Sequence, residues 1–535
     1  MSASAAAKGC QVLQALCLAA WIIVTSTPAP AAEPRSELAR IVSEIRQRPI
    51  FRGSKFGIVI ANVETGRVLY SLNRATLFAP ASTVKVLSAA GALATLGKDF
   101  RFRTKIVATG PVKGGTLRGD LVLVGAGDPN LSQRVTSSDR LAFKNNDHSY
   151  AGSFRGSVVD GNPLKVIHSL AKQVKQIGVR AIEGNIVVDD GLFADTSDEF
   201  AGPLSAVCIN DNLIDVFIQP AKRVGDPPLA RSQPSSKAVT IVNRARTVAT
   251  GGKTQLWLEM RPGLANYELH GTIALESKPV LRVAPVNTPG LLASHYLADA
   301  LENQSIRIDG ESKHSRFGPT IYARYPVLVT HISPPLSEAI RVTLKVSQNV
   351  HASMLPLLVG ALHGERSTRR EGFRVIREHF SKSLDMGAVA VSGGSGGGRA
   401  DRLSPGWMVT FLRHLSRRDD FQVLFDALPI GGVDGTLANS FRGSILSEKV
   451  HAKTGTLVYR DAFNGYWVYA TKSLAGYLDL RTRRRPDNLW AFMIVTENTL
   501  APTRRRGAHE LMRAHEEILR TAITEIEKLP TSPTN

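Results

Sequence analysis

The sequence predicts a mixed α and β fold in which a β-rich region interrupts a larger domain of helices and strands. Apolar residues recur at helical spacing over residues 81–96, and the same spacing returns over 336–362 and 369–384. Between these stretches, residues 107–320 hold short β-like runs separated by Gly, Pro and Asn. Because helical patterns lie on both sides of the β-rich block, we expect that block to be an insert.

The segments before the insert predict a helix, a β-hairpin and a second helix. Residues 38–46 have a helical pattern, and residues 56–62 and 67–73 alternate as two strands around a turn at 64–66. The apolar helix of residues 81–96 follows directly. After the insert, strands alternate with turns, and we expect a final amphipathic helix to pack on a sheet instead of lying on a membrane surface.

Changes of pattern along the 535 residues predict five segments. They are a signal peptide (1–31), the first part of the main domain (32–106), the inserted β-rich region (107–320, with an inner nested domain at roughly 195–290), the second part of the main domain (321–528) and a disordered tail (529–535). Residues 133–160 are polar and rich in Gly, Ser and Asn, so we expect a long surface loop there.

The N-terminus predicts export. Lys8 precedes an apolar run over residues 12–24, and small residues at 29–31 suit cleavage. We therefore expect a periplasmic protein that is soluble once residues 1–31 are removed. Of the 3 cysteines only Cys208 would remain, so the fold would rest on packing without an internal disulfide.

The net charge of +20 raises the question of an anionic partner. Arginines cluster at residues 481–485 and 504–506. Export removes the chain from nucleic acid, and no interleaving of aromatic and basic residues accompanies the clusters. We expect no nucleic-acid partner; peripheral contact with an anionic membrane or wall polymer and a merely solvated basic surface both remain open.

Ser82 and Lys85 are the first candidate catalytic pair. They lie three residues apart at the start of the predicted 81–96 helix, so their side chains share one face. A serine hydroxyl is a weak nucleophile at neutral pH and needs an adjacent base. A lysine can be that base if burial or a nearby positive charge lowers its pKa.

Two later stretches complete an ordered set of three motifs. Ser347-Gln-Asn349 lies between two helical runs, and Lys453-Thr-Gly455 lies on a predicted strand. An S-x-x-K motif followed by Ser-x-Asn and K-T-G is typical of the active sites of serine β-lactamases and penicillin-binding proteins. The order of the three motifs and their context make the signal specific.

Beyond the motifs, most of the chain resembles the D-alanyl-D-alanine carboxypeptidase/endopeptidases, which are soluble low-molecular-mass penicillin-binding proteins with a large insert. The stretches that carry the resemblance are Phe78–Lys85, Phe100–Phe102, Gly119–Leu121, Gly127–Pro129, Ile182–Asn185, Gly394–Gly396, Asp434–Leu437 and Lys453–Leu457. The resemblance implies a transpeptidase domain like that of β-lactamases, with an antiparallel sheet flanked by helices and one or two inserted β-rich domains.

The same resemblance implies an enzyme without cofactor or metal that acts on peptidoglycan stem peptides ending in D-Ala-D-Ala. It also implies inhibition by β-lactam antibiotics. Terminal D-alanine removal and cleavage of cross-links are both within the family's activity.

The resemblance and the chemistry of the side chains together suggest roles. Ser82 would attack the carbonyl carbon and become acylated, Lys85 would take its proton, and Ser347 would relay that proton to the leaving nitrogen. The backbone N–H groups of Ser82 and Thr456 would form the oxyanion hole. The substrate-binding residues would be Asn349, Lys453, Thr454, Gly455 and Thr456.

Three departures from the family pattern stand out. Gln348 occupies the middle position of the second motif, where Asp or Asn is usual, and Gly393 replaces an Asp before Gly394. Residues Val458–Lys472 form an extra segment that could cover the cleft or change substrate choice.

Two other functions compete with this interpretation. Gly393–Gly397 also fits the G-x-S-x-G pattern of an esterase with Ser395 as nucleophile, although no helix is expected directly after it. A penicillin-sensing or wall-binding protein without turnover is the second alternative. The histidines lack ligand spacing, and we expect His351 and His451 to be cleft neighbours or surface groups.

Overall fold

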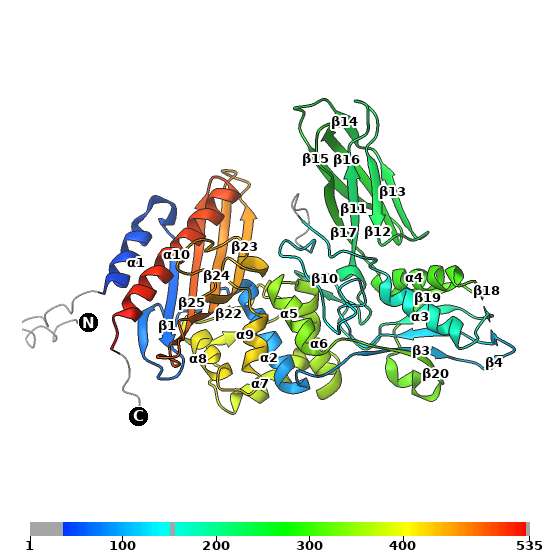
Figure 1. Ribbon diagram of the computed structural model, residues 1–535, viewed down its shortest axis with the longest axis horizontal. Coiled ribbons are helices and arrows are strands. Elements are labelled where there is room, and N and C mark those ends of the chain that lie inside the picture. The colour runs from blue at the N-terminus through cyan, green and yellow to red at the C-terminus, as the bar shows by residue number, and fades with distance from the viewer. Residues whose placement is uncertain (1–35, 150–155, 531–535) are drawn as a thin grey trace, which may run out of the picture.

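The computed structural model describes residues 36–149 and 156–530. The predicted signal peptide (1–31) lies outside the described residues, as do residues 531–535 of the predicted tail and part of the predicted loop over 133–160. A sheet with helices on both faces forms one end of the molecule, and the β-rich insert forms the other (Figure 1).

One antiparallel sheet of five strands is the centre of the main domain, in the order β2-β1-β25-β24-β23. Its strands are β1 (Lys55–Asn62), β2 (Val68–Leu72), β23 (Val450–Arg460), β24 (Trp467–Asp479) and β25 (Leu489–Ala501). The predicted hairpin is present, because β1 and β2 pair antiparallel. β1 also pairs with β25 along its whole length, which joins the two ends of the chain. The edge strand β23 carries the K-T-G motif.

Two helices, α1 (Glu37–Gln47) and α10 (Arg504–Glu527), cover one face of this sheet (Figure 1). Leu511 and Ile518 of α10 are fully buried against apolar strand residues such as Ile494. The prediction that the last helix packs on a sheet is confirmed. None of the helices in the described ranges has the length and apolar run that crossing a bilayer requires.

The other face of the sheet is covered by a group of helices between the sheet and the insert (Figure 1). They are α2 (Val84–Leu96), α5 (Leu336–Lys345), α6 (Asn349–His363), α7 (Arg369–Ser381), α8 (Pro405–Leu415) and α9 (Phe421–Ala427). α2 is buried along most of its length, as expected of a helix that is apolar on all sides. It is the central helix of this core.

The helical pattern over residues 336–362 forms two helices with a break at Val346–Gln348. Ser347 adopts a left-handed backbone with φ 57°. The Gln348 side chain then accepts hydrogen bonds from the backbone N–H groups of Val350 and His351, which caps the start of α6. The break leaves Ser347 in a tight loop, where its side chain reaches the K-T-G strand.

The insert is built on a second sheet of order β19-β8-β6-β3-β20. Its strands are β3 (Arg103–Ala108), β6 (Leu121–Val124), β8 (Ile186–Asp189), β19 (Ser312–Ser315) and β20 (Val327–Ile332). β3, which the predicted boundary at 106 divides, pairs with both β6 and β20 inside this sheet. We propose that the insert runs from β3 to β20.

Helices α3 (Lys165–Gln176) and α4 (Pro289–Asn303) pack on the insert sheet (Figure 1). A small sheet at its side contains β4 (Val112–Lys113), β5 (Thr116–Leu117), β7 (Ala181–Ile182) and β18 (Arg307–Ile308). The remaining short elements are β9 (Ser197–Asp198), β10 (Gly202–Pro203), β21 (Val389–Ala390), β22 (Arg402–Leu403), η1 (Pro49–Phe51), η2 (Ala81–Thr83), η3 (Asn210–Asn212), η4 (Pro319–Arg324) and η5 (Gly435–Leu437).

The outer end of the insert consists of two further sheets. Their strands are β11 (Leu213–Gln219), β12 (Leu229–Gln233), β17 (Val280–Pro285), β13 (Val239–Asn243), β14 (Arg246–Val248), β15 (Gln255–Arg261) and β16 (Ala265–Ala274). We propose that the inner nested domain is 213–285, shorter than expected. The segment before β11 belongs to the junction, because Asp198 and Asp211 contact the main domain.

Candidate active site

Ser82 lies in η2, a single turn of 3-10 helix that leads into α2. The carbonyl oxygen of Pro80 accepts hydrogen bonds from Thr83 Oγ1 at 2.8 Å and from Ser473 Oγ at 2.7 Å. These bonds fix the turn against β24. The Ser82 side chain is thereby held at the end of a buried helix while the residue itself stays partly exposed.

Lys85, one turn further along, is fully buried and contacts three oxygens. Its Nζ lies 2.8 Å from Ser82 Oγ, 2.7 Å from Asn349 Oδ1 and 2.7 Å from the carbonyl oxygen of Ser395. The last two oxygens can only accept, so each takes one N–H of the lysine. A neutral amine then has its lone pair left for the Ser82 hydroxyl, which is the geometry of a base that activates this serine.

Burial lowers the pKa of Lys85 to about 7, and the carboxylate of Asp198 acts in the opposite direction. Of the two expected causes, burial and a nearby positive charge, burial is the one that lowers the pKa of Lys85. The charge effect falls on Lys453, whose pKa is held well below its ordinary value by burial and then by the charges of Lys85 and Lys472. The two buried lysines therefore oppose each other's protonation.

Ser347 and Lys453 form the opposite side of the site. Lys453 Nζ donates to Ser347 Oγ at 2.7 Å and to the carbonyl oxygen of Thr454 at 2.8 Å. The side chain of Lys453 is fully buried. Ser347 thus forms a hydrogen bond with the lysine of the third motif, and Ser82 forms one with Lys85 of the first motif.

Gly455 allows β23 to lie directly against the turn that carries Ser82. A Cβ at this position would lie 2.7 Å from the carbonyl oxygen of Pro80, 3.0 Å from Ala81 Cβ and 2.2 Å from Ser473 Oγ. Any larger residue would push the K-T-G strand away from Ser82. The glycine of this motif is therefore explained by a close approach of two backbones.

The outer edge of β23 offers backbone donors to the site. The Ala452 N–H donates to the carbonyl oxygen of Pro429, so it points away from β24. Because N–H directions alternate along a strand, the N–H groups of Thr454 and Thr456 lie on the same outer edge. This direction agrees with the role suggested for the N–H of Thr456.

Residues outside the three motifs support the K-T-G strand. Thr454 Oγ1 hydrogen bonds with Thr436 Oγ1 at 3.0 Å, and Lys472 Nζ donates to Thr456 Oγ1 at 2.9 Å. Asp434, two residues before Thr436, forms a 2.7 Å ion pair with Lys345. The family resemblance over Asp434–Leu437 was the sequence signal for Asp434 and Thr436. Lys472 could be found only once its register opposite Thr456 was known.

The structure shows what lies at Gln348 and Gly393, the two positions that depart from the family pattern. Gln348 acts as the cap of α6 through its side-chain oxygen. At Gly393, a Cβ would lie 3.1 Å from Asp198 Oδ2, and Asp198 pairs with Arg369 at 2.9 Å. The carboxylate beside this loop therefore comes from the insert. The segment Val458–Lys472 lengthens the hairpin of β23 and β24.

A buried ionic network joins the insert to α6. Asp211 Oδ1 accepts from His351 Nε2 at 2.7 Å, and its Oδ2 accepts from Arg134 at 2.7 Å and from His148 Nε2 at 2.8 Å. Arg134 also pairs with Asp147. His351 is two residues after Asn349, so the network fixes the end of α6 that reaches Lys85.

Within the described ranges, two groups of side chains are close enough to share a cation. One is on the exposed strands β15 and β16, and the other is part of the buried network, where the guanidinium of Arg134 already supplies positive charge. Their members are Glu259, Glu268 and His270, and Asp147, His148 and Asp211. In the buried group Asp211 binds His351 of α6, so this group supports the site as an ionic network.

Ser395 does not have the surroundings of a nucleophile. Its Oγ is buried without a hydrogen-bond partner among the described residues, and its backbone oxygen accepts from Lys85. His451, in turn, is half-buried and stacks on Phe425. An esterase site at Ser395 would require a base beside its hydroxyl. The structure gives this alternative no support.

A cleft of about 1040 Å³ lies beside the motif residues. It is lined by Asn349, Thr454 and Thr456 of the main domain and by Phe200 and Leu213 of the insert. A molecule bound in this cleft would therefore contact both parts of the chain.

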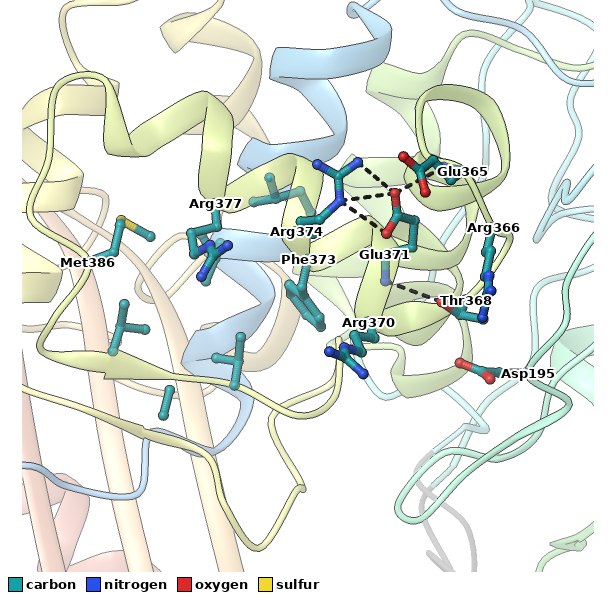
Figure 2. Close-up of a pocket in the computed structure, with 15 residues that line it drawn as sticks. Asp195, Glu365, Arg366, Thr368, Arg370, Glu371, Phe373, Arg374, Arg377 and Met386 are labelled. Carbon is teal, nitrogen blue, oxygen red and sulfur yellow. Dashed lines mark hydrogen bonds and ion pairs between the residues drawn. The ribbon is translucent and has the colours of Figure 1, made fainter.

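A second cavity of about 930 Å³ lies between α7 and β21, and none of the predicted site residues lines it. Figure 2 shows Arg374 directed at Glu371 on its wall, where the two side chains form an ion pair. Residues of the second and third motifs line the cleft of about 1040 Å³, so we place the chemistry there.

Comparisons with known proteins agree with this geometry. The chain is 27% identical to the D-alanyl-D-alanine carboxypeptidase of Actinomadura sp. (strain R39) over 455 residues, which cover 81% of this chain and 78% of that protein. It is 24% identical to the D-alanyl-D-alanine carboxypeptidase DacB of Haemophilus influenzae over 475 residues, which cover 83% and 91% of the two chains.

The fold is also found in a solved structure. The crystal structure of penicillin binding protein 4 from Haemophilus influenzae matches with a TM-score of 0.70 and 21% identity, covering 89% of this chain and 99% of that one. A second structure of that protein, in complex with a β-lactam, has a TM-score of 0.68, 22% identity and coverage of 90% and 98%. The predicted fold class, a penicillin-binding-protein domain with helices and sheets, is confirmed.

A family model matches residues 38–515. This range includes all three motifs and the whole insert, so the resemblance inferred from the sequence is confirmed over nearly all of the described residues. The chain belongs to the D-Ala-D-Ala carboxypeptidase 3 (S13) family.

Proposed function

We propose that this chain is a serine-type D-Ala-D-Ala carboxypeptidase whose acyl-enzyme forms on Ser82. The observation that carries the assignment is the environment of Lys85 Nζ, which contacts Ser82 Oγ while Asn349 and the carbonyl oxygen of Ser395 occupy its N–H groups. A buried lysine with a pKa of about 7 is half neutral at neutral pH and can accept a proton.

In the first step Ser82 Oγ attacks the carbonyl carbon of the penultimate D-alanine. A C–O bond forms, the Ser82 proton passes to Lys85, and the carbonyl electrons move onto the oxygen. The N–H groups of Ser82 and Thr456 stabilise that oxyanion. The outward direction of the Thr456 N–H supports this role.

In the second step the C–N bond breaks and D-alanine leaves. Its nitrogen needs a proton, which Ser347 donates and then regains from Lys85 through the hydroxyl groups of the site. Lys453 orients Ser347 by a 2.7 Å hydrogen bond. Water then attacks the ester carbon and gives a proton to Lys85, which is neutral again. The ester C–O bond breaks, the shortened peptide leaves as an acid, and Ser82 Oγ takes the proton back from Lys85.

Lys453 supplies positive charge for the terminal carboxylate of the substrate. Among the described residues no carboxylate forms an ion pair with it, and burial disfavours its charged form. A bound carboxylate provides the missing counter-charge and raises the Lys453 pKa again. The protonated Lys453 in turn keeps Lys85 neutral, so substrate binding favours the active protonation state.

The same site acts on cross-linked stem peptides if their D-Ala carbonyl reaches Ser82, which makes the chain also a DD-endopeptidase. β-Lactams acylate Ser82 and block it.

The mature chain acts in the periplasm after loss of residues 1–31. The arginine clusters at 481–485 and 504–506 contact anionic membrane or wall polymer there, and binding to anionic vesicles that high salt abolishes would support this contact.

Fluorescent penicillin and a D-Ala-D-Ala peptide test the proposal together. The purified mature protein is expected to be labelled and to release D-alanine, and Ser82→Ala is expected to do neither. Ser395→Ala is the matched control and should retain labelling. Labelling that persists in Ser82→Ala would refute the role of this serine. Labelling without D-alanine release would favour a penicillin sensor.

A further inference from the structure

Lys472 is a partly buried cation beside the K-T-G strand that none of the sequence motifs contains. It lies on β24 directly opposite Thr456 of β23. Its Nζ donates a 2.9 Å hydrogen bond to Thr456 Oγ1. The same side chain lines the 1040 Å³ cleft together with Thr454, Thr456 and Asn349. A lysine of the neighbouring strand therefore reaches the substrate side of the edge strand.

Lys472 has no carboxylate partner among the residues that the structure describes, and burial alone lowers its pKa to about 8. The acids that line the cleft are already paired. Asp211 binds Arg134 at 2.7 Å, and Glu199 binds Arg399 at 2.8 Å. A partly buried ammonium without a counter-ion has a cost to the fold, and such a group is often retained for function.

The hydrogen bonds around Lys472 leave donors free for an anion. Thr456 Oγ1 accepts from Lys472, so its own O–H must point to another acceptor. The N–H of Thr456 lies on the outer edge of β23. Lys453 extends from the opposite face of the strand, but it lies close enough to Lys472 that the charge of Lys472 lowers the Lys453 pKa. In the described ranges no carboxylate pairs with either lysine, so an anion at Thr456 would lie near two unpaired positive charges.

We propose that Lys472 is a second positive group for the carboxylate of the substrate's leaving D-alanine, acting beside Lys453 and through the Thr456 hydroxyl. This inference rests on the proposed function and names a residue that sets its specificity. This carboxylate belongs to the residue after the scissile bond. In a substrate whose scissile carbonyl lies at Ser82, the carboxylate would lie further along the K-T-G strand. Lys472 favours substrates with a free carboxylate at that position.

The test compares two peptides with the same scissile bond, one ending in D-Ala-D-Ala and one ending in D-Ala-D-Ala amide. Lys472→Met keeps the apolar stem and removes the charge. It is expected to lower kcat/KM for the acid about 10- to 100-fold, the range of a lost hydrogen-bonded charge, and to change kcat/KM for the amide less than about threefold. Lys472→Arg should recover most of the activity on the acid. Lys113→Met, an exposed lysine of the insert, is the matched control and should behave as wild type.

Equal losses on the acid and the amide would show a structural role and overturn the proposal, as would an unchanged rate on the acid. The thermal midpoint of Lys472→Met should not fall, since the variant removes an uncompensated, partly buried charge. If the wild-type protein releases no D-alanine from the acid, the proposed function fails on its own. Lys472 is then tested by acylation with a penicillin and with its methyl ester. A loss confined to the free acid supports the carboxylate contact, and equal rates refute it.

Discussion

The buried network at Asp211 predicts that a single conservative change will uncouple the insert from the main domain. The Asp211 carboxylate accepts hydrogen bonds from Arg134, His148 and His351, and all four side chains are at most 2% exposed. Asp211→Asn keeps the shape of the side chain but removes its charge. Arg134 keeps Asp147 as a partner and His148 keeps Asp215, whereas no other carboxylate within the described residues pairs with His351.

The magnitude follows from the loss of one partner in a buried ion pair, which costs about 3–5 kcal/mol of unfolding free energy. The pH dependence has a definite sign. Burial opposes the charged form of His148, but its hydrogen bonds to Asp211 and Asp215 prevail and raise its pKa to about 10. A raised pKa adds stability that is complete below the unfolded value of about 6.5 and is lost as the pH rises through about 10. The deficit of Asp211→Asn is therefore expected to be largest below pH 6.5 and to shrink towards pH 10.

Urea denaturation at several pH values measures this deficit. Asp160→Asn is the control, because Asp160 is 90% exposed and pairs with Lys144 at the surface of the same region. Its cost should stay below about 1 kcal/mol. The Asp211 variant should also lose kcat, since His351 lies one half-turn beyond Asn349 on α6. Equal stability losses in the two variants, or a deficit that grows with pH, would refute the reasoning.

Two further predictions concern the chemistry itself. The rate of acylation by penicillin should rise about tenfold per pH unit below a pKa of about 7 and level off above it, because Lys85 acts as a base only when neutral; a flat profile between pH 5.5 and pH 8 would contradict this. Gly455→Ala should lower kcat/KM at least about 100-fold, because its Cβ would lie 2.7 Å from the Pro80 oxygen and would displace β23 from Ser82. Stopped-flow acylation measures both effects, and wild-type rates in Gly455→Ala would show that the backbones can separate without cost.

The motif residues could be predicted from the sequence because their chemistry restricts both residue type and spacing. A serine needs a base within hydrogen-bond reach, and a lysine one helical turn away meets that need. The structure brings Ser82, Lys85 and Asn349 into direct contact, and it connects Ser347 to Lys453. Local patterns also predicted the hairpin, the central helix and the last helix, because burial of one face leaves a period in the sequence.

Contacts that depend on register or on distant segments could not be predicted. Strand alternation is the same whether the strand of residues 103–108 belongs to the main sheet or to the insert, and only its pairing with β6 and β20 decides. Lys472 is opposite Thr456 through the register of β23 and β24, and a shift by one residue would turn it to the other face. Asp198 lies far from Arg369 in the sequence, and no local pattern links them.

The insert contributes to the active site through contacts that end beside catalytic groups. Asp211 binds His351 on the helix that begins with Asn349. Asn145 Oδ1 accepts from the backbone N–H of Gly435, in the turn whose next residue hydrogen bonds with the K-T-G strand. Without the insert, the His351 side chain and the Gly435 N–H would need water as a partner. The arrangement of the three motifs therefore depends on the insert as well as on the main sheet.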